Sequence, residues 1–180
     1  MSLHRDALTT LRTWSAPDAG QERLRGRMAD HLAAHANGVR RSCFPDHLTA
    51  GTLVLAADGE AVLLNLHRKA RRWFAFGGHC EDQDATLAGA AHREASEESG
   101  LKGLRLHPEP VHLDAHRVDF CDPRGTVTHL DVRYAALADP GAEHRASAES
   151  VELRWWPLSG LPELEEEMHV LIARAREVLL

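Results

Sequence analysis

The first 40 residues contain two stretches whose apolar positions repeat with the period of an α-helix. The apolar positions are Leu8, Leu11 and Trp14 in the first stretch and Leu24, Met28, Leu32 and His35 in the second. A turn around Pro17 separates the stretches, and Asn37-Gly38 suits the end of the second helix. We therefore predict that residues 1–40 form a helical extension packed on a main domain of residues 41–180.

Beyond this extension the pattern becomes that of β-strands. Two apolar runs flank Asp58-Gly59, which is a strong signal for a β-hairpin. Further strand-like stretches follow at residues 111–120, 126–137 and 151–158, and residues 161–180 carry the apolar stripe of a closing helix. Strands joined by tight turns cannot run parallel, so the pattern favours an α/β (α+β) domain with a mixed sheet over a doubly wound parallel sheet.

Composition narrows the possible settings and partners. The 180 residues carry a formal net charge of −6, which gives no global support for binding nucleic-acid polymers or anionic membranes. The chain has no apolar run long enough to cross a bilayer, and its first ten residues lack the apolar core of a signal peptide. Three widely spaced cysteines argue against a disulfide framework and a cysteine zinc knuckle. We expect a reducing, cytoplasmic setting, and a homodimer formed through the N-terminal helices stays open.

An acidic cluster closes the helix predicted over residues 87–99. Glu94, Glu97 and Glu98 share one surface of its last turns, where like charges four residues apart cost about 0.2–0.5 kcal/mol. Each carboxylate near the negative end of the helix dipole costs about 0.3–1 kcal/mol more. Taken alone, such a cluster indicates a solvated acidic face. A hard divalent cation bound beside the close backbone approach at Gly77-Gly78 would reverse both penalties.

The segment "GG", followed by acids and "REASEESGL", resembles the Nudix box of Nudix hydrolases. The second half of the motif is complete: Arg93, Glu94, Ala95, Glu97, Glu98, Gly100 and Leu101. The first half differs from the usual motif in two ways. Five residues separate Gly78 from Asp84, which stands where the usual motif has glutamate. Eight residues, instead of the usual seven, then separate Asp84 from Arg93. The resemblance covers residues 48–180 and implies a Nudix-like α/β/α sandwich in which Asp84 anchors Arg93.

The resemblance also implies a set of functional residues. It assigns Glu94 and Glu98 as ligands of Mg²⁺ or Mn²⁺, with Glu97 as a third ligand or the residue that orients water. Glu97, Glu98 and Arg93 form the catalytic group, and Gly77 contributes its carbonyl. A further metal ligand is expected from a late loop, where Glu149 is preferred to Glu152. Glu81 is expected to contact the metal through water. Structural roles in the motif are expected for Gly78, Asp84 and Gly100.

Three regions are candidates for binding a diphosphate substrate. The basic turn at residues 67–73 includes Arg68 and Lys69, although a solvated turn is an equal alternative. Strand alternation places Arg133 in a polar row with His129 and Asp131, which predicts a cleft lining or, alternatively, a solvated edge face. His79, beside the paired glycines, is the one histidine expected near phosphate.

The remaining histidines and cysteines do not indicate another site. The chain has 13 histidines, but they are scattered; His112 and His116 share a strand face without completing a ligand trio, so no histidine metal site is predicted. The leading functional hypothesis is metal-dependent hydrolysis of a diphosphate linkage in a small nucleoside diphosphate derivative or similar molecule. The alternatives are a non-catalytic nucleotide-binding module and a diphosphate isomerase, for which Cys43 would have to supply a cysteine acid/base.

Overall fold

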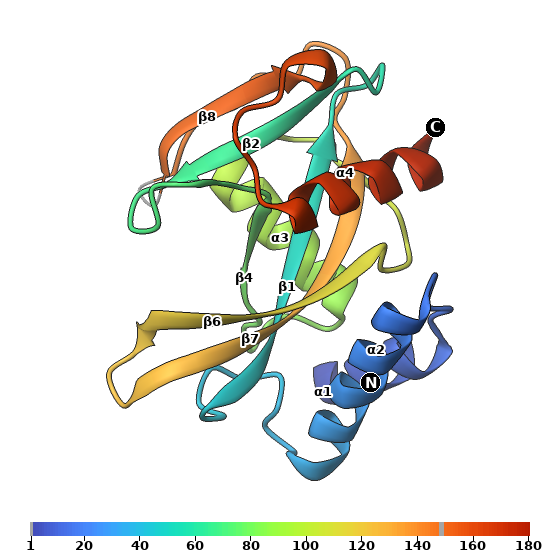
Figure 1. Cartoon of the computed structure of the whole chain (residues 1–180), viewed down its shortest axis with the longest axis vertical. Coiled ribbons are helices and arrows are strands. Elements are labelled where there is room, and N and C mark those ends of the chain that lie inside the picture. The colour runs from blue at the N-terminus through green and yellow to red at the C-terminus, as the bar shows by residue number, and fades with distance from the viewer. Residues whose placement is uncertain (1, 148–149) are drawn as a thin grey trace.

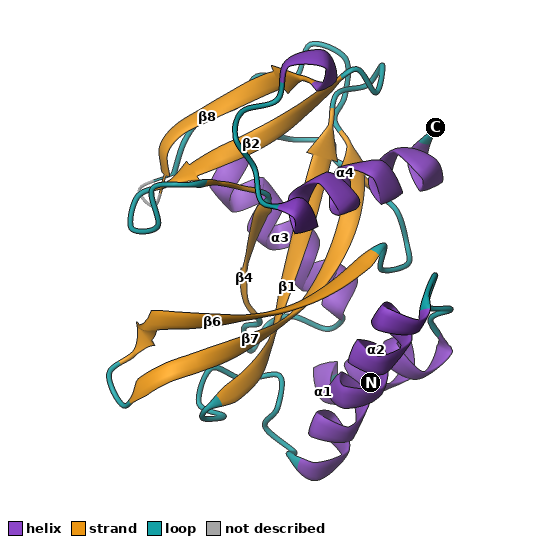
Figure 2. Ribbon diagram, viewed as in Figure 1, coloured by secondary structure: helices purple, strands orange, loops and turns teal. Residues whose placement is uncertain are grey.

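A computed structural model describes residues 2–147 and 150–180 and has, within them, a curled eight-stranded mixed sheet with four α-helices (Figures 1 and 2). The helices are α1 (Leu3–Thr13), α2 (Ala19–Ala34), α3 (Leu87–Ser99) and α4 (Glu166–Leu179). The strands are β1 (Asp46–Leu55), β2 (Ala61–His67), β3 (Trp73–Phe74), β4 (Phe76–His79), β5 (Arg105–Leu106), β6 (His112–Asp122), β7 (Gly125–Leu137) and β8 (Ser150–Pro157).

Strand β1 is the centre of the sheet. It runs parallel to β7 and antiparallel to β2 and β4, while β6 and β5 pair with β7, and β3 and β8 pair with β2. The predicted mixed sheet is therefore confirmed. The hairpin at Asp58-Gly59 and the turn between β6 and β7 are also where the sequence places them. Gly59 has a φ of 73°, the left-handed conformation that glycine adopts without strain.

Helix boundaries differ from the sequence prediction at two places. Helix α2 ends at Ala34, before Asn37-Gly38. The closing helix begins at Glu166 instead of residue 161, after a short 3₁₀ turn at Leu158–Gly160. Leu161 is extended, with φ −63° and ψ 149°, because the ring of the following Pro162 disfavours a helical conformation in the preceding residue.

Helices α3 and α4 cover opposite faces of the sheet, as Figure 1 shows with α4 in front and α3 behind. Alternate residues of β1 supply both contacts. Leu53 and Leu55 are buried in one cluster with α4, whereas Val54 is buried in another with Ala95 of α3. The small residues of α3 allow a close approach, and the Thr52 hydroxyl donates to the carbonyl of Ala91 at 3.0 Å.

The N-terminal helices share a core with the sheet. Leu11 and Met28 are buried in the same cluster as Leu48 of β1. The side-chain amide of Gln21 donates to the Leu113 carbonyl at 2.9 Å and accepts from the Leu113 amide at 2.7 Å. This one side chain of α2 therefore satisfies both backbone groups of a β6 residue, as a neighbouring strand would. These contacts agree with the predicted packing of the extension, although its division from the main domain at residue 40 stays a prediction.

The three cysteines are free and buried. Burial raises the pKa of Cys80 to about 12, so this residue is a protonated thiol at neutral pH. Among the described residues, no helix combines the length and the apolar character that a membrane span requires.

Candidate active site

Helix α3 ends as its sequence predicts and thereby presents the acidic cluster. The Thr86 hydroxyl caps its first turn by accepting from the Gly89 amide at 2.9 Å. Gly100 ends the helix in the left-handed conformation, with a φ of 69°. Glu94, Glu97 and Glu98 consequently lie in the last two turns, next to the paired glycines of β4.

Arg93 organises the acidic cluster from within. Its Nη1 donates to Glu94 at 3.0 Å and to Glu97 at 3.1 Å, and its Nη2 donates to the backbone carbonyl of His79 at 3.1 Å. Its Nε and Nη2 donate to the two carboxylate oxygens of Asp84 at 3.0 and 2.9 Å. Asp84 therefore contacts Arg93 as the resemblance implies, and its role as the anchor of the motif stays a prediction.

Asp84 closes the turn that precedes α3. The Asp84 carboxylate accepts from the Glu81 amide at 2.7 Å, and the Asp84 amide donates to the Glu81 carbonyl at 3.1 Å. Burial acts to raise the pKa of Asp84, but the hydrogen bonds from Arg93 and from the Glu81 amide lower it overall. The same hydrogen bonds from Arg93 to Asp84 raise the pKa of the guanidinium, so both partners are charged at neutral pH.

Glu94 lies under the paired glycines. Its side chain is only 14% exposed, and burial raises its pKa although the adjacent Arg93 acts to lower it. A Cβ atom added to Gly78 would lie 2.8 Å from the Glu94 carboxylate. Glycine at this position therefore leaves the space that the Glu94 carboxylate occupies.

Glu98 is bonded to the neighbouring glycine. The Gly77 amide donates to Glu98 at 3.3 Å, which joins the end of α3 to β4. A Cβ atom on Gly77 would lie 2.8 Å from the Cα of Gly51 in β1. The close pairing of β1 and β4 therefore requires glycine at residue 77, and that pairing places the Gly77 amide beside Glu98.

These residues fit a hard divalent cation. Four glutamates, Glu81, Glu94, Glu97 and Glu98, gather around the single guanidinium of Arg93, which lies within 4.0 Å of the first three. The cluster therefore carries excess negative charge and offers carboxylate oxygens, the ligands that Mg²⁺ and Mn²⁺ prefer. Of the two late-loop candidates, Glu149 lies outside the described residues, and Glu152 is an exposed residue of β8 opposite Leu66.

Arg133 lies in the same row of the sheet as the paired glycines. Gly51 of β1 is in register with Arg133 of β7 on one side and with Gly77 of β4 on the other. Arg133 donates to Asp131 at 2.8 Å and to Asp114 at 2.7 Å. The polar side chains of this row are therefore bonded to one another and do not form a solvated edge face. Arg133 Nη1 is buried without a hydrogen-bond partner among the described residues, which leaves the N–H groups of this nitrogen for a ligand.

The basic turn after β2 contacts β8 and β6. Arg68 donates to the Ser150 carbonyl at 2.9 Å, and the Lys69 ammonium lies 5.4 Å from the ring centre of Phe120, near the end of β6. Phe120 is 53% exposed, and its ring is also stacked on His67 at 6.0 Å. A cationic side chain of the turn therefore lies beside an exposed aromatic ring of β6.

The His79 side chain is directed to a different set of residues. Its backbone carbonyl supports Arg93, whereas its imidazole meets His47, Cys121 and His129. Sequence reasoning missed this group. No local spacing could have shown it, because the four residues come from four strands and only the sheet register brings them together.

Comparisons with known proteins agree with this architecture. The family model described as the NUDIX domain matches residues 45–175. The NUDIX domain of Shewanella oneidensis NrtR, solved with ADP ribose, is similar at 22% identity and a TM-score of 0.58, covering 84% of this chain and 98% of that one. A NUDIX-family hydrolase from Clostridium perfringens is similar at 23% identity and a TM-score of 0.56, covering 74% and 98%. A C. elegans Ap4A hydrolase is similar at 17% identity and a TM-score of 0.55, covering 73% and 96%. No curated protein gave a match.

Proposed function

Because the chain belongs to the NUDIX domain family, we propose that it is a metal-dependent pyrophosphohydrolase that cleaves the diphosphate linkage of a nucleoside diphosphate derivative. The observation that carries the proposal is the acidic cluster around Arg93. Its guanidinium bonds Asp84, Glu94 and Glu97 together, while Glu98 is bonded to Gly77. The motif is therefore assembled in space in spite of its altered first half.

Glu94 and Glu98 are the proposed ligands of Mg²⁺ or Mn²⁺, with Glu97 and the Gly77 carbonyl as further donors. The cation, when bound, neutralises phosphate oxygens and lowers the pKa of water. Glu97 and Glu98 are the candidates for orienting the attacking water and accepting its proton. Arg93 holds the carboxylates in place through its hydrogen bonds, and Glu149 is the proposed late-loop ligand.

The substrate class is proposed from basic groups of the sheet and of the turn after β2. The unpartnered Nη1 of Arg133 is suited to donate to a phosphate oxygen. Arg68 and Lys69 are proposed to contact the part of the substrate beyond the diphosphate, where the exposed ring of Phe120 offers a stacking surface. ADP ribose and Ap4A, which the names of two similar proteins mention, are nucleotide derivatives of this kind.

The direct test is hydrolysis of a diphosphate panel that includes ADP ribose and Ap4A, with Mg²⁺, with Mn²⁺ and with a chelator. We expect a metal-dependent product for at least one compound and a loss of roughly 100-fold or more in kcat/KM for Glu98→Gln. Glu177→Gln, in an exposed position of α4, is the matched control and should retain full activity. Wild-type activity of the Glu98→Gln variant would contradict the assignment.

The same panel separates the alternatives. A non-catalytic binding module would bind a panel compound in calorimetry and release no product with any metal. A diphosphate isomerase would need Cys43, but this residue is only 5% exposed, with its sulfur 4.0 Å from His31 Nε2. Full activity of Cys43→Ser would exclude that chemistry.

The setting of the enzyme is part of the proposal. We propose a cytoplasmic protein with reduced cysteines, a small-molecule diphosphate as its partner, and neither a nucleic-acid polymer nor a membrane as a ligand. The homodimer predicted as a possibility is tested by light scattering of the full chain in comparison with a form that lacks residues 1–37.

A further inference from the structure

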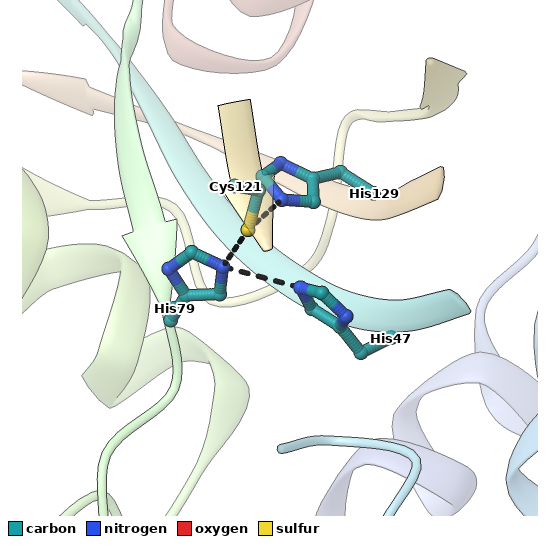
Figure 3. A group of neighbouring side chains, drawn as sticks. All are labelled: His47, His79, Cys121 and His129. Carbon is teal, nitrogen blue, oxygen red and sulfur yellow. Dashed lines mark hydrogen bonds between the residues drawn. The ribbon is translucent and has the colours of Figure 1, made fainter. Parts of the chain in front are cut away.

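Three imidazoles and one thiol converge on a single point beside β1 (Figure 3). His47 comes from β1, His79 from the end of β4, Cys121 from β6 and His129 from β7. One nitrogen or sulfur atom of each lies within 4.8 Å of the corresponding atoms of the others. None of these four side chains takes part in the proposed hydrolysis.

Three donor–donor distances within this histidine–cysteine cluster are close to those of a tetrahedral metal site, and all the donor atoms lie within 4.8 Å of one another. His79 Nε2 lies 3.1 Å from His47 Nε2 and 3.3 Å from Cys121 Sγ, and His129 Nε2 lies 3.4 Å from the same sulfur. Ligand bonds of about 2.0–2.1 Å for zinc to nitrogen and about 2.3 Å for zinc to sulfur place neighbouring donors about 3.3–3.6 Å apart.

Backbone pairing explains why the four side chains meet. His47 and His129 are opposite each other in the parallel pair of β1 and β7, and His79 is opposite Thr49 in the neighbouring pair. The pairing of β6 with β7 becomes irregular between Val118 and Asp122, and this irregularity contains Cys121. Such irregularities redirect side chains, and here the cysteine is turned toward the three imidazoles (Figure 3).

A second hydrogen bond sets the tautomer of one imidazole. His47 Nδ1 donates to the Cys43 carbonyl at 3.1 Å, so a neutral His47 directs the lone pair of Nε2 into the cluster. His79 Nε2 carries one proton at most, so it can donate a hydrogen bond to either His47 Nε2 or the Cys121 sulfur, but not fully to both.

We propose that His47, His79, Cys121 and His129 bind one Zn²⁺ ion in a tetrahedral site separate from the glutamate cluster. Imidazole nitrogen and thiolate sulfur favour Zn²⁺ over Mg²⁺ or Mn²⁺. Four protein ligands leave no open position, so the ion is structural. Binding releases the Cys121 proton to solvent, and the resulting thiolate coordinates the metal.

The position of His79 couples this ion to the active site. His79 ends the strand that contains Gly77 and Gly78, and its carbonyl accepts from Arg93. A bound ion would join β4 to β1, β6 and β7, and so hold the strand on which the carboxylates depend. Metal binding by these four side chains does not depend on the proposed hydrolysis.

Cobalt substitution tests the site directly. Metal-free protein, prepared with a chelator and a thiol-free reductant, is titrated with Co²⁺ and then with Zn²⁺. We expect one tightly held equivalent of Co²⁺, with the visible bands of tetrahedral Co²⁺ and a thiolate charge-transfer band that Zn²⁺ abolishes. Zn²⁺ should also raise the Tm of the wild-type protein.

Variants identify the ligands. Cys121→Ser should lose the charge-transfer band, and His129→Gln should weaken Co²⁺ binding by more than about tenfold, because even the loss of an outer-shell partner costs that much. Cys43→Ser, His169→Gln and Glu98→Gln are the matched controls and should keep the wild-type spectrum. Far-UV circular dichroism establishes that each variant is folded before titration.

The wild-type titration decides the question even if a ligand variant does not fold. Failure of the wild-type protein to bind either ion at micromolar concentration would overturn the proposal. Persistence of the charge-transfer band in Cys121→Ser, or its loss in Cys43→Ser, would do so as well. Retention of the cobalt spectrum by Glu98→Gln with loss of hydrolysis would show that the two sites are distinct.

Discussion

The carboxylate of Asp84 accepts two hydrogen bonds from the guanidinium of Arg93, although the two residues lie nine positions apart in a motif of altered length. The Asp84 side chain is 4% exposed and that of Arg93 is 15% exposed. This pair is therefore a buried, bidentate ion pair that joins the turn before α3 to the helix itself. The ion pair holds Arg93 among the glutamates although the motif is one residue longer than usual.

Replacing Asp84 by Asn should destabilise the fold. Asparagine removes the negative charge that Arg93 faces, and the loss of one partner from a buried pair costs about 3 kcal/mol or more in the free energy of unfolding. Urea denaturation measures the change, and Asp30→Asn on the exposed side of α2 is the control. A loss below about 1 kcal/mol would mean that Glu94 and Glu97 can hold the guanidinium without Asp84.

The paired glycines should respond differently to alanine. In Gly78→Ala the new methyl group meets the carboxylate end of Glu94, which can move, so kcat/KM should fall about 10- to 100-fold with little change in stability. In Gly77→Ala the methyl group meets the Gly51 backbone, which cannot move easily, so unfolding should become about 1–3 kcal/mol easier. Equal effects of the two changes on activity and stability would contradict this distinction.

Alanine at Gly26 should stabilise the protein. Gly26 lies inside α2, and a Cβ atom there would have no heavy atom within 4 Å beyond its own helix and chain neighbours. Because alanine has the higher helix propensity, the free energy of unfolding should rise by about 0.5–1 kcal/mol. The rise is measured by urea denaturation, and a decrease would indicate that the N-terminal helices need flexibility at this position.

The stability of the fold should fall in acid partly through His112. This side chain is 2% exposed, and burial, with a smaller effect of Arg133, lowers its pKa from 6.5 to about 4 although the Glu167 carboxylate is 3.3 Å away. The unfolded chain therefore takes up a proton first as the pH falls from about 6.5 to about 4. Stability is lost over that window, by up to about 3 kcal/mol from this residue.

A variant isolates this contribution. Unfolding free energies of His112→Gln, measured by urea denaturation between about pH 7 and pH 4, should depend less steeply on pH than those of the wild-type protein. The contributions of His79 and His129 are common to both proteins and cancel in the difference. His169→Gln, exposed on α4, should retain the wild-type slope. Parallel profiles for wild type and His112→Gln would rule His112 out as the cause.

The local elements were predictable because their causes are local. The stretch from Thr86 to Gly100 contains its own cap, apolar face and terminator, so the sequence predicts both the helix and the surface that its glutamates share. The β1–β2 hairpin follows in the same way from Asp58-Gly59. Strand β4 was missed because four residues with two glycines show no periodicity, and only pairing with β1 makes them a strand.

The sequence by itself determined the family resemblance and the acidic end of α3, because both depend on neighbours a few residues apart. Tertiary structure alone decided which distant residues meet. Sheet register set Arg133 in line with Gly51 and Gly77, and it brought His47 and His129 together with His79. A helix repeats over a few residues and can be inferred from a single stretch, whereas the register of a sheet depends on contacts between stretches far apart in the chain.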